Sequence, residues 1–292
     1  MRENDASIMH VIEIAGKTRV VIKNGKVEEV GEPLVKSCPL WKEFFGLDEF
    51  TREFIAERVQ KVMIEKRGLF TERRTFELLP EVDFGVSEMM MDARRDGLID
   101  VAVEVSDGAG TVIVGDPELI EGIAGQMPAV IVASPIPDVI DRLEAGGAVV
   151  LDPATAKIDQ VAGVERAIEL GYKKIGVSVI RAEDAKRLRE LEEKRGTEIT
   201  IFTVHTTGLA QWEVEAMAEH VDVITACASE SIREIVGRRA LIQIGTKIPL
   251  FALTKRGKRI ILNRAMHIDK KLLIKGEDLP FRSDTEPYPL SE

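Results

Sequence analysis

From residue 85 onward, short and almost wholly apolar runs alternate with segments whose apolar residues recur at helical spacing. Continuous apolar runs, such as Val-Asp-Val-Ile at 221–224, are typical of strands buried on both faces of a parallel sheet. Strands that alternate with helices of about ten residues are typical of the α/β class. The pattern therefore predicts an α/β fold over residues 85–268, with a mostly parallel sheet flanked by helices.

The same pattern sets the individual elements that we expect in this region. Apolar runs predict strands at 99–105, 112–114, 129–133, 148–151, 174–180, 199–204, 221–224 and 249–253. Three- and four-residue spacing, with prolines near the starts and glycines near the ends, predicts helices at 86–95, 116–122, 137–143, 161–170, 182–194, 211–219, 229–238 and 257–266.

The first 84 residues follow a different pattern. Residues 8–31 alternate between apolar and polar positions, and Asn24-Gly25 separates two β-branched runs, which is a strong hairpin signal. Residues 48–66 have helical spacing, with Asp48 or Thr51 as the N-terminal cap and Gly68 as the stop.

Three parts of the chain follow from these patterns. Residues 1–84 form a unit of β-hairpin and helix, with 67–84 as a linker to the rest. Residues 85–268 form the α/β ligand-binding domain. Residues 269–292 are rich in proline near the end and poor in apolar residues, so we expect an extended or disordered tail.

Charge and cysteine content narrow the classes of protein. The chain has 50 acidic and 40 basic residues, a net charge of −10, which argues against general nucleic-acid binding. It has no apolar stretch of about 20 residues that could span a bilayer, and its first residues lack the apolar core of a signal peptide. Two cysteines match neither a disulfide framework nor a zinc site. We therefore expect a cytoplasmic protein without membrane or nucleic-acid partners.

Three polar segments, at 106–111, 205–208 and 225–229, follow directly after predicted strands. The carboxyl ends of parallel strands are where α/β proteins bind ligands, so these segments mark the candidate site. The first segment offers Asp107 for a proton, hydroxyl or metal. Its glycines, Gly108 and Gly110, together with Thr111, would let backbone amides approach an anion.

The first segment matches neither nucleotide fingerprint. Ile113 stands where a dinucleotide-binding loop needs glycine, and the chain has no phosphate-binding loop of the Gly-x-x-x-x-Gly-Lys-Ser/Thr type. The alternative is a tight turn between two strands. Anion binding by backbone amides is therefore the most that this segment supports.

The other two segments carry side chains suited to proton transfer and nucleophilic chemistry. His205 titrates near neutral pH, and Thr206 and Thr207 add hydroxyls. Cys227 becomes a nucleophile or metal ligand if its environment lowers the thiol pKa, and Ser229 lies beside it. The alternatives are a histidine bonded to backbone, hydroxyls that cap a helix, and a cysteine that only packs. Whether Cys38 approaches Cys227 stays open.

Several strings of the chain resemble the archaeal family catalogued as methanogenesis marker protein 8. They are Gly-Lys-Thr-Arg-Val-Val at 16–21, Val-Gly-Glu-Pro-Leu at 30–34 running into Cys-Pro-Leu at 38–40, Asp-Gly-Ala-Gly-Thr at 107–111, Leu-Asp-Pro at 151–153 with Lys-Ile-Asp-Gln-Val at 157–161, Val-His-Thr-Thr-Gly-Leu at 204–209, Thr-Ala-Cys-Ala-Ser at 225–229 and Pro-Leu-Phe-Ala-Leu-Thr at 249–254. The resemblance implies a cytoplasmic role in methanogenesis, in assembling or maintaining methyl-coenzyme M reductase or a cofactor. It supplies no catalytic residues.

Two hypotheses for function follow. The first is a ligand-binding enzyme or maturation factor, with Asp107, His205 and Cys227 as catalytic residues. Its small-molecule ligand would be held by Gly108, Gly110, Thr111, Thr206, Thr207 and Ser229. The second is a non-catalytic accessory protein that docks on a methanogenesis enzyme. The residues identify no cofactor, and two cysteines in one chain discourage a metal or redox site, although a cluster shared across a dimer interface stays open.

Overall fold

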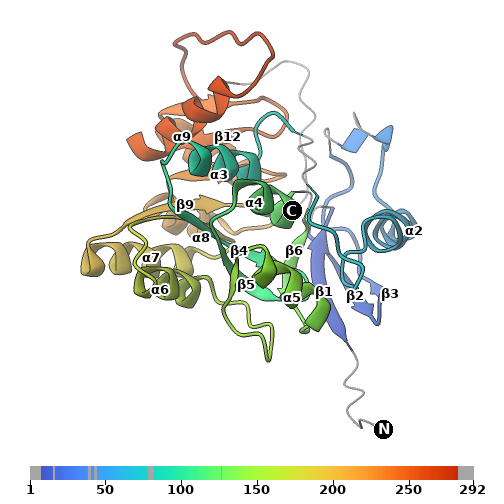
Figure 1. The fold of residues 1–292 in the computed structure, drawn as a ribbon. Helices are drawn as coiled ribbons and strands as arrows, with labels where there is room; N and C mark the ends of the chain where they lie inside the picture. The colour runs from blue at the N-terminus through green and yellow to red at the C-terminus, as the bar shows by residue number, and fades with distance from the viewer. Residues whose placement is uncertain are drawn as a thin grey trace, which may run out of the picture.

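The computed structural model describes residues 8–15, 17–38, 41–42, 45–77, 82–125 and 127–281. An N-terminal antiparallel sheet of four strands packs beside a larger mixed sheet of eight strands, and helices cover both faces of the larger sheet (Figure 1). No helix within these ranges is long and apolar enough to cross a bilayer.

The larger sheet is parallel only in its centre. Its four central strands run parallel to one another: β10 (Val223–Thr225), β9 (Glu198–Thr203), β8 (Lys174–Val179) and β4 (Val101–Ser106). The outer strands are antiparallel to their neighbours: β5 (Gly110–Val114) and β7 (Val149–Val150) beside β4, and β12 (Leu250–Ala252) and β11 (Ile242–Ile244) beside β10. The expectation of a mostly parallel sheet is confirmed in part: the centre is parallel, whereas a tight turn folds β5 back onto β4 on one side and β12 pairs antiparallel with β10 on the other.

Two layers of helices explain why the strands are apolar on both faces. One face is covered by α6 (Gln160–Glu169), α7 (Ala182–Arg195), α8 (Gln211–Ala218) and the π-helical turn η2 (Ile232–Val236), which continues as the 3₁₀ turn η3 (Gly237–Arg239). The other face is covered by α3 (Val86–Arg95), α4 (Pro117–Ala124), α5 (Pro137–Ala145) and α9 (Lys255–Met266). Neighbouring strand residues therefore face different helix layers, and each finds apolar partners.

The N-terminal sheet takes one strand from the middle of the chain. Its order is β3 (Lys26–Val30), β2 (Thr18–Lys23), β1 (Met9–Ile14) and β6 (Ala129–Val132). The hairpin signal is confirmed: Asn24 and Gly25 both have positive φ, as a tight hairpin turn requires. The 129–133 run was expected in the parallel sheet, and this is corrected: β6 pairs antiparallel with β1, and Ile131 and Val132 stay partly exposed on the edge strand.

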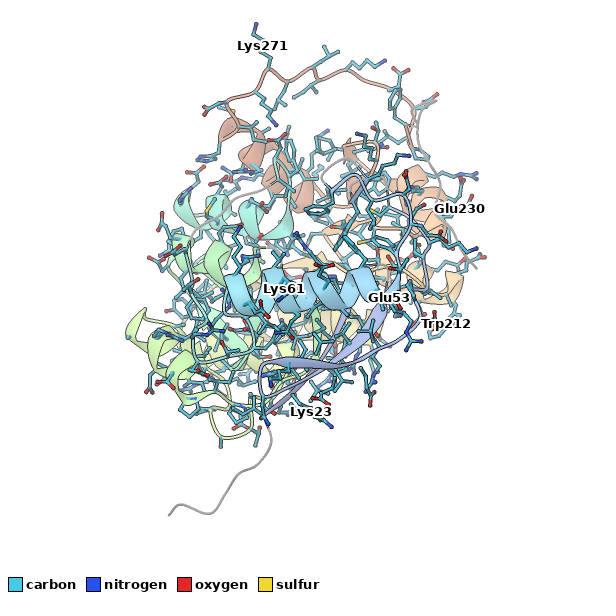
Figure 2. All side chains as sticks on the ribbon, turned by 90° about the vertical axis from the view of Figure 1, so that its right-hand side faces the viewer. Lys23, Glu53, Lys61, Trp212, Glu230 and Lys271 are labelled. Atoms are coloured by element: carbon cyan, nitrogen blue, oxygen red, sulfur yellow. The ribbon has the colours of Figure 1, made fainter. Side chains whose placement is uncertain are left out.

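One long helical segment covers the N-terminal sheet. It begins as α2 (Arg52–Glu57) and continues as the π-helical η1 (Arg58–Lys66). Of the two expected caps, Thr51 is confirmed, since its hydroxyl accepts the N–H of Phe54 at 3.2 Å. Ile55 and other apolar residues face the sheet, and Glu53 and Lys61 lie on the outward face (Figure 2).

The segment 67–84, expected as a linker, carries a deeply buried arginine. Arg74 is 2% exposed, and its Nε lies 2.8 Å from Oδ1 of Asp107 in the β4–β5 turn. Its Nη2 also donates to the carbonyls of Gly122 and Ile123, near the C-terminal end of α4, at 3.0 and 3.1 Å. Oδ2 of Asp107 accepts the N–H of Phe70 at 2.7 Å. The segment therefore joins the N-terminal sheet to the larger sheet, and the domain boundary at residue 84 stays a prediction.

The chain after α9 has no helix or strand within the described residues up to 281. The extended or disordered tail expected over residues 269–292 stays a prediction. The remainder of the predicted tail lies outside the described residues.

We expect Asp107→Asn to lower the free energy of unfolding by about 3–5 kcal/mol, because it leaves the buried Arg74 guanidinium without a counter-charge. Urea unfolding followed by circular dichroism measures this difference. Arg52→Met is the control, since it removes an exposed pair with Glu32, and a loss below about 1 kcal/mol is expected. An Asp107→Asn protein as stable as the wild type would contradict this structural role.

Candidate functional site

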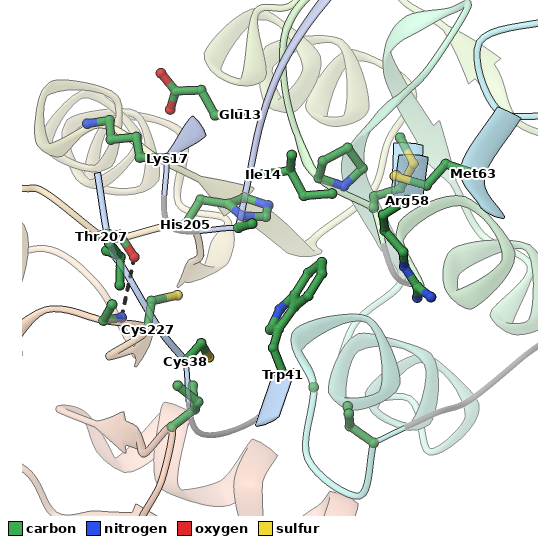
Figure 3. Close-up of a pocket in the computed structure, with 18 of the residues that line it drawn as sticks. Glu13, Ile14, Lys17, Cys38, Trp41, Arg58, Met63, His205, Thr207 and Cys227 are labelled. Carbon is green, nitrogen blue, oxygen red and sulfur yellow. Dashed lines mark hydrogen bonds between the residues drawn. The ribbon is translucent and has the colours of Figure 1, made fainter. Parts of the chain in front are cut away.

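A cavity of about 410 Å³ lies where the N-terminal unit meets the carboxyl ends of β9 and β10 (Figure 3). The end of β1, the segment around Trp41 and the helix η1 form one side. The starts of the loops after β9 and β10 form the other, and the first turn of α3 and part of α4 complete the wall. The cavity therefore exists only because the two sheets pack together.

Two residues predicted from the sequence line this cavity from neighbouring parallel strands. His205 follows β9 and Cys227 follows β10, and both have left-handed backbone, with φ of 55° and 45°. Ala15 and Lys17, which line the cavity from the connection between β1 and β2, also have positive φ. Non-glycine residues adopt this conformation at a cost of about 1–3 kcal/mol, and such strain concentrates at functional sites.

Hydrogen bonds between the two loops hold His205 and Cys227 in place. The Thr206 hydroxyl donates to the carbonyl of Thr225 at 2.6 Å, and the Thr207 hydroxyl accepts the N–H of Ala228 at 3.3 Å. Thr207 also lines the cavity, whereas Thr206 is fully buried. The loops after β9 and β10 are therefore one connected structure.

Ser229 has a structural partner of its own. Its hydroxyl accepts the N–H of Ile232 at 3.2 Å, at the start of η2, and its carbonyl accepts a hydrogen bond from Arg233 at 2.9 Å. The Ser229 hydroxyl therefore caps the helical segment that begins there. Ser229 is not among the residues that line the cavity.

The imidazole of His205 is neutral at physiological pH. Burial lowers its pKa from 6.5 to about 4, because the charged ring would lose its hydration. Within the described part of the chain, no group hydrogen-bonds to this ring. His205 therefore presents one N–H donor and one nitrogen lone pair to whatever occupies the cavity.

Both cysteines of the chain line the same cavity, which answers the question that the sequence left open. Cys38 and Cys227 are half-buried and not disulfide-bonded, and Figure 3 shows them at the same end of the cavity as Thr207. Among the described residues, no group of three histidines, cysteines or acids has the geometry to hold a metal ion. Two thiols from distant parts of the chain therefore line one cavity.

The glycine segment after β4 lies elsewhere. Ser106 pairs with Gly110 across the antiparallel β4–β5 hairpin, so the segment is the tight turn that the sequence left as an alternative. Asp107 is engaged by Arg74, and the Thr111 hydroxyl donates to Oε1 of Gln160 at 2.7 Å.

The glycines of this turn have a packing reason. A Cβ at Gly108 would lie 3.1 Å from the side chain of Ile136, and one at Gly110 would lie 2.2 Å from the carbonyl oxygen of Ala156. Both glycines also have positive φ. None of the four candidates in this segment, Asp107, Gly108, Gly110 and Thr111, is among the cavity-lining residues.

Sequence reasoning did not single out the acidic residues at the cavity. Glu88 on α3 and Glu121 on α4 line it, and burial raises the pKa of both, that of Glu121 to about 8. Glu104 lies behind them on β4, fully buried, with its pKa raised well above the usual range. A glutamate inside the apolar run 101–105 was the available signal, because charged residues are almost never fully buried without a reason.

Comparison with known proteins places the chain in an archaeal family. Residues 10–266 match the profile of the family described as "Uncharacterized protein conserved in archaea (DUF2099)". The chain belongs to this family. An uncharacterised protein of Methanocaldococcus jannaschii is 46% identical over 282 residues, which cover 96% of this chain and 99% of that protein. The matched region includes every segment that lines the cavity.

Glu121 makes stability depend on pH in a defined direction. Its pKa rises from 4.5 to about 8 on folding, so between these values the native state binds more protons than the unfolded chain. The free energy of unfolding therefore falls as pH rises from about 5 to 8. The fall that Glu121 causes is at most about 1.4 kcal/mol for each pH unit. In Glu121→Gln, the free energy of unfolding should fall less steeply with pH. The fall that remains is the part caused by Glu88 and Glu104.

Urea unfolding at about pH 5 and pH 8 measures this slope. Glu118→Gln is the matched control, because Glu118 lies on the same helix but is exposed and paired with Arg95, which lowers its pKa. The control should keep the wild-type slope over this range. Equal slopes in Glu121→Gln and wild type would contradict the assignment.

Proposed function

We propose that this protein binds a small anionic organic molecule in the cavity between its two sheets, with His205, Thr207, Cys227 and Cys38 facing the ligand. The observation that carries the proposal is that His205 and Cys227 line one cavity together with Cys38. His205 and Cys227 follow neighbouring parallel strands, and both have left-handed backbone. A volume of about 410 Å³ lies in the range of small-molecule sites.

The charge and aromatic content of the wall support an anion with a flat apolar body. Lys17, Arg58 and Arg67 line the cavity, and the Arg58 guanidinium lies 4.2 Å from the ring centroid of Phe45. Trp41 contacts Phe45 edge-on, which makes an aromatic wall beside these cations. Glu121 is largely protonated at pH 7, so it opposes the cations less than an ionised carboxylate would.

The pKa of His205 favours a binding role for this residue over a role as the base that activates a thiol. A thiol ordinarily has a pKa of about 8.5, so an imidazole with a pKa of about 4 is a poor acceptor for its proton. A neutral imidazole instead hydrogen-bonds a ligand as donor and acceptor. We assign Asp107 to the structure rather than to the chemistry, because Arg74 and Phe70 occupy both of its oxygens.

The biological setting in this proposal comes from the resemblance to methanogenesis marker protein 8. Membership in a family conserved in archaea supports an archaeal setting. We propose on that basis that the ligand is a cofactor or intermediate of methanogenesis, handled in the cytoplasm. The protein would act as an enzyme or as a maturation factor for methyl-coenzyme M reductase. The alternative is a non-catalytic accessory protein that docks on a methanogenesis enzyme.

Anilinonaphthalene sulfonate, an aromatic anion, is a direct probe of the cavity. We expect saturable binding that quenches Trp41 in a Trp212→Phe background, since Trp212 is 68% exposed on α8 and outside the cavity. Lys17→Met should weaken binding about fivefold, because it removes one cation from the wall. Lys23→Met, an exposed lysine of the same sheet outside the cavity, should leave the affinity unchanged.

Thiol labelling gives a second measurement on the same protein. The chain has only two cysteines, and both line the cavity, so saturating probe should slow alkylation of both by iodoacetamide. Mass spectrometry counts the labels. Two results together would refute the proposal: alkylation that the probe does not slow, and the same probe affinity in Lys17→Met as in the wild type. Stable copurification with a large partner, together with no saturable probe binding, would support the docking alternative.

A further inference from the structure

Three glutamates from three different elements meet behind the cavity. Glu88 comes from α3, Glu104 from β4 and Glu121 from α4, and all three are 3% exposed or less. Glu121 lies close enough to both others to interact electrostatically: Glu88 raises the pKa of Glu121, and Glu121 raises that of Glu104. We call these three residues the carboxyl cluster.

Two members of the carboxyl cluster lack a hydrogen bond of good geometry among the described residues. Both side-chain oxygens of Glu104 and both of Glu121 are buried without one, and Glu121 has only the nearby Ser87 hydroxyl to favour its ionised form by hydrogen bonding. Glu88, in contrast, accepts the hydroxyl of Ser87 at 3.0 Å and the N–H of Val82 at 3.4 Å. Buried polar atoms are nearly always paired in native proteins, because an unpaired one costs several kcal/mol. The two unpaired oxygens of Glu104, beside the poorly paired carboxyl of Glu121, therefore point to a ligand.

Glycines make the room for these carboxyls. A Cβ at Gly125 would lie 2.5 Å from Oε1 of Glu121, and a Cβ at Gly85 would lie 2.0 Å from Oε2 of Glu88. Gly85 precedes α3 and Gly125 follows α4, with φ of −117° and −56°, which any residue can adopt. A side chain at either position would displace a carboxyl of the cluster, so the two glycines at these helix ends leave room for Glu88 and Glu121 where they lie.

The carboxyl cluster lies where two cavities meet. Glu88 and Glu121 line the cavity described above, and Glu104 lines a second one of about 370 Å³. Both cavities are also lined by Ser87 and His205. A ligand in the first cavity can therefore extend past His205 towards the carboxyls.

We propose that Glu88, Glu104 and Glu121 form a subsite that binds the primary ammonium group of a ligand. This inference rests on the proposed function and specifies its ligand as an amine-bearing molecule. An ammonium group has three N–H donors and is satisfied by acceptors at about 2.8 Å. A metal ion needs oxygens at about 2.0–2.6 Å, and no group of three acids within the described residues has that geometry.

The cations that face the carboxyl cluster are already engaged. Arg67 donates to the carbonyl of Gly125 at 3.2 Å, and Arg264 donates to Oδ2 of Asp92 at 2.6 Å. Both arginines favour the ionised form of Glu121, yet burial outweighs them. A bound ammonium would supply the missing counter-charge. Binding would therefore release protons from the carboxyl cluster, and affinity should rise with pH up to about 8, where Glu121 ionises without a ligand.

Dansylcadaverine and its N-acetyl derivative test the ammonium directly, because they share the aromatic body and differ in one cationic group. Fluorescence titration of the full chain should give about tenfold tighter binding of the free amine. Glu121→Gln and Glu104→Gln should each abolish most of this preference while leaving the affinity for the acetylated probe unchanged. Glu118→Gln, on the outer face of α4, should keep the preference.

The outcomes separate this inference from the proposed function. Equal affinity of the wild type for the two dansyl probes, with anilinonaphthalene sulfonate still bound, would overturn the ammonium subsite alone. Loss of all three probes' binding would overturn both. Near-ultraviolet circular dichroism establishes that each glutamine variant is folded, and two independent variants keep the test decisive if one is not. A preference that survives in both folded variants also counts against the carboxyl cluster.

Discussion

The buried ion pair between Arg74 and Asp107 is the interaction on which the rest of the structure depends. Asp107 sits in the turn that reverses β4 into β5, and Arg74 comes from the segment that leads out of the N-terminal unit. The same arginine also binds two carbonyls near the C-terminal end of α4. Because the cavity takes its walls from both sheets, its shape depends on this anchor between them.

Burial also sets the charge of the cavity wall. It lowers the pKa of His205 to about 4 and raises that of Glu121 to about 8, so both side chains are mainly neutral near pH 7. Desolvation disfavours whichever form is charged, and this explains why a base and an acid shift in opposite directions. The cations Lys17, Arg58 and Arg67 line the same cavity, together with Glu13.

The cavity contains some of the residues predicted from the ends of strands, but not others. The segments after β9 and β10 follow parallel strands, so the rule about strand ends brought His205, Thr207 and Cys227 to one cavity. The segment after β4 also follows a strand of the parallel centre, but it is a tight turn into β5, and Arg74 binds Asp107 there. Arg74 and Asp107 are 33 residues apart in the chain, so local sequence does not show this contact.

Local sequence determined most of the helices and strands, the Asn24-Gly25 hairpin and the Thr51 cap, because spacing, β-branching and capping act over a few neighbouring residues. Only the tertiary structure decided that β6 joins the N-terminal sheet, that Cys38 reaches the cavity of Cys227, and that three glutamates lie together. These features depend on contacts between residues far apart in the chain. Their free energies come from burial and charge, which exist only once the elements are packed.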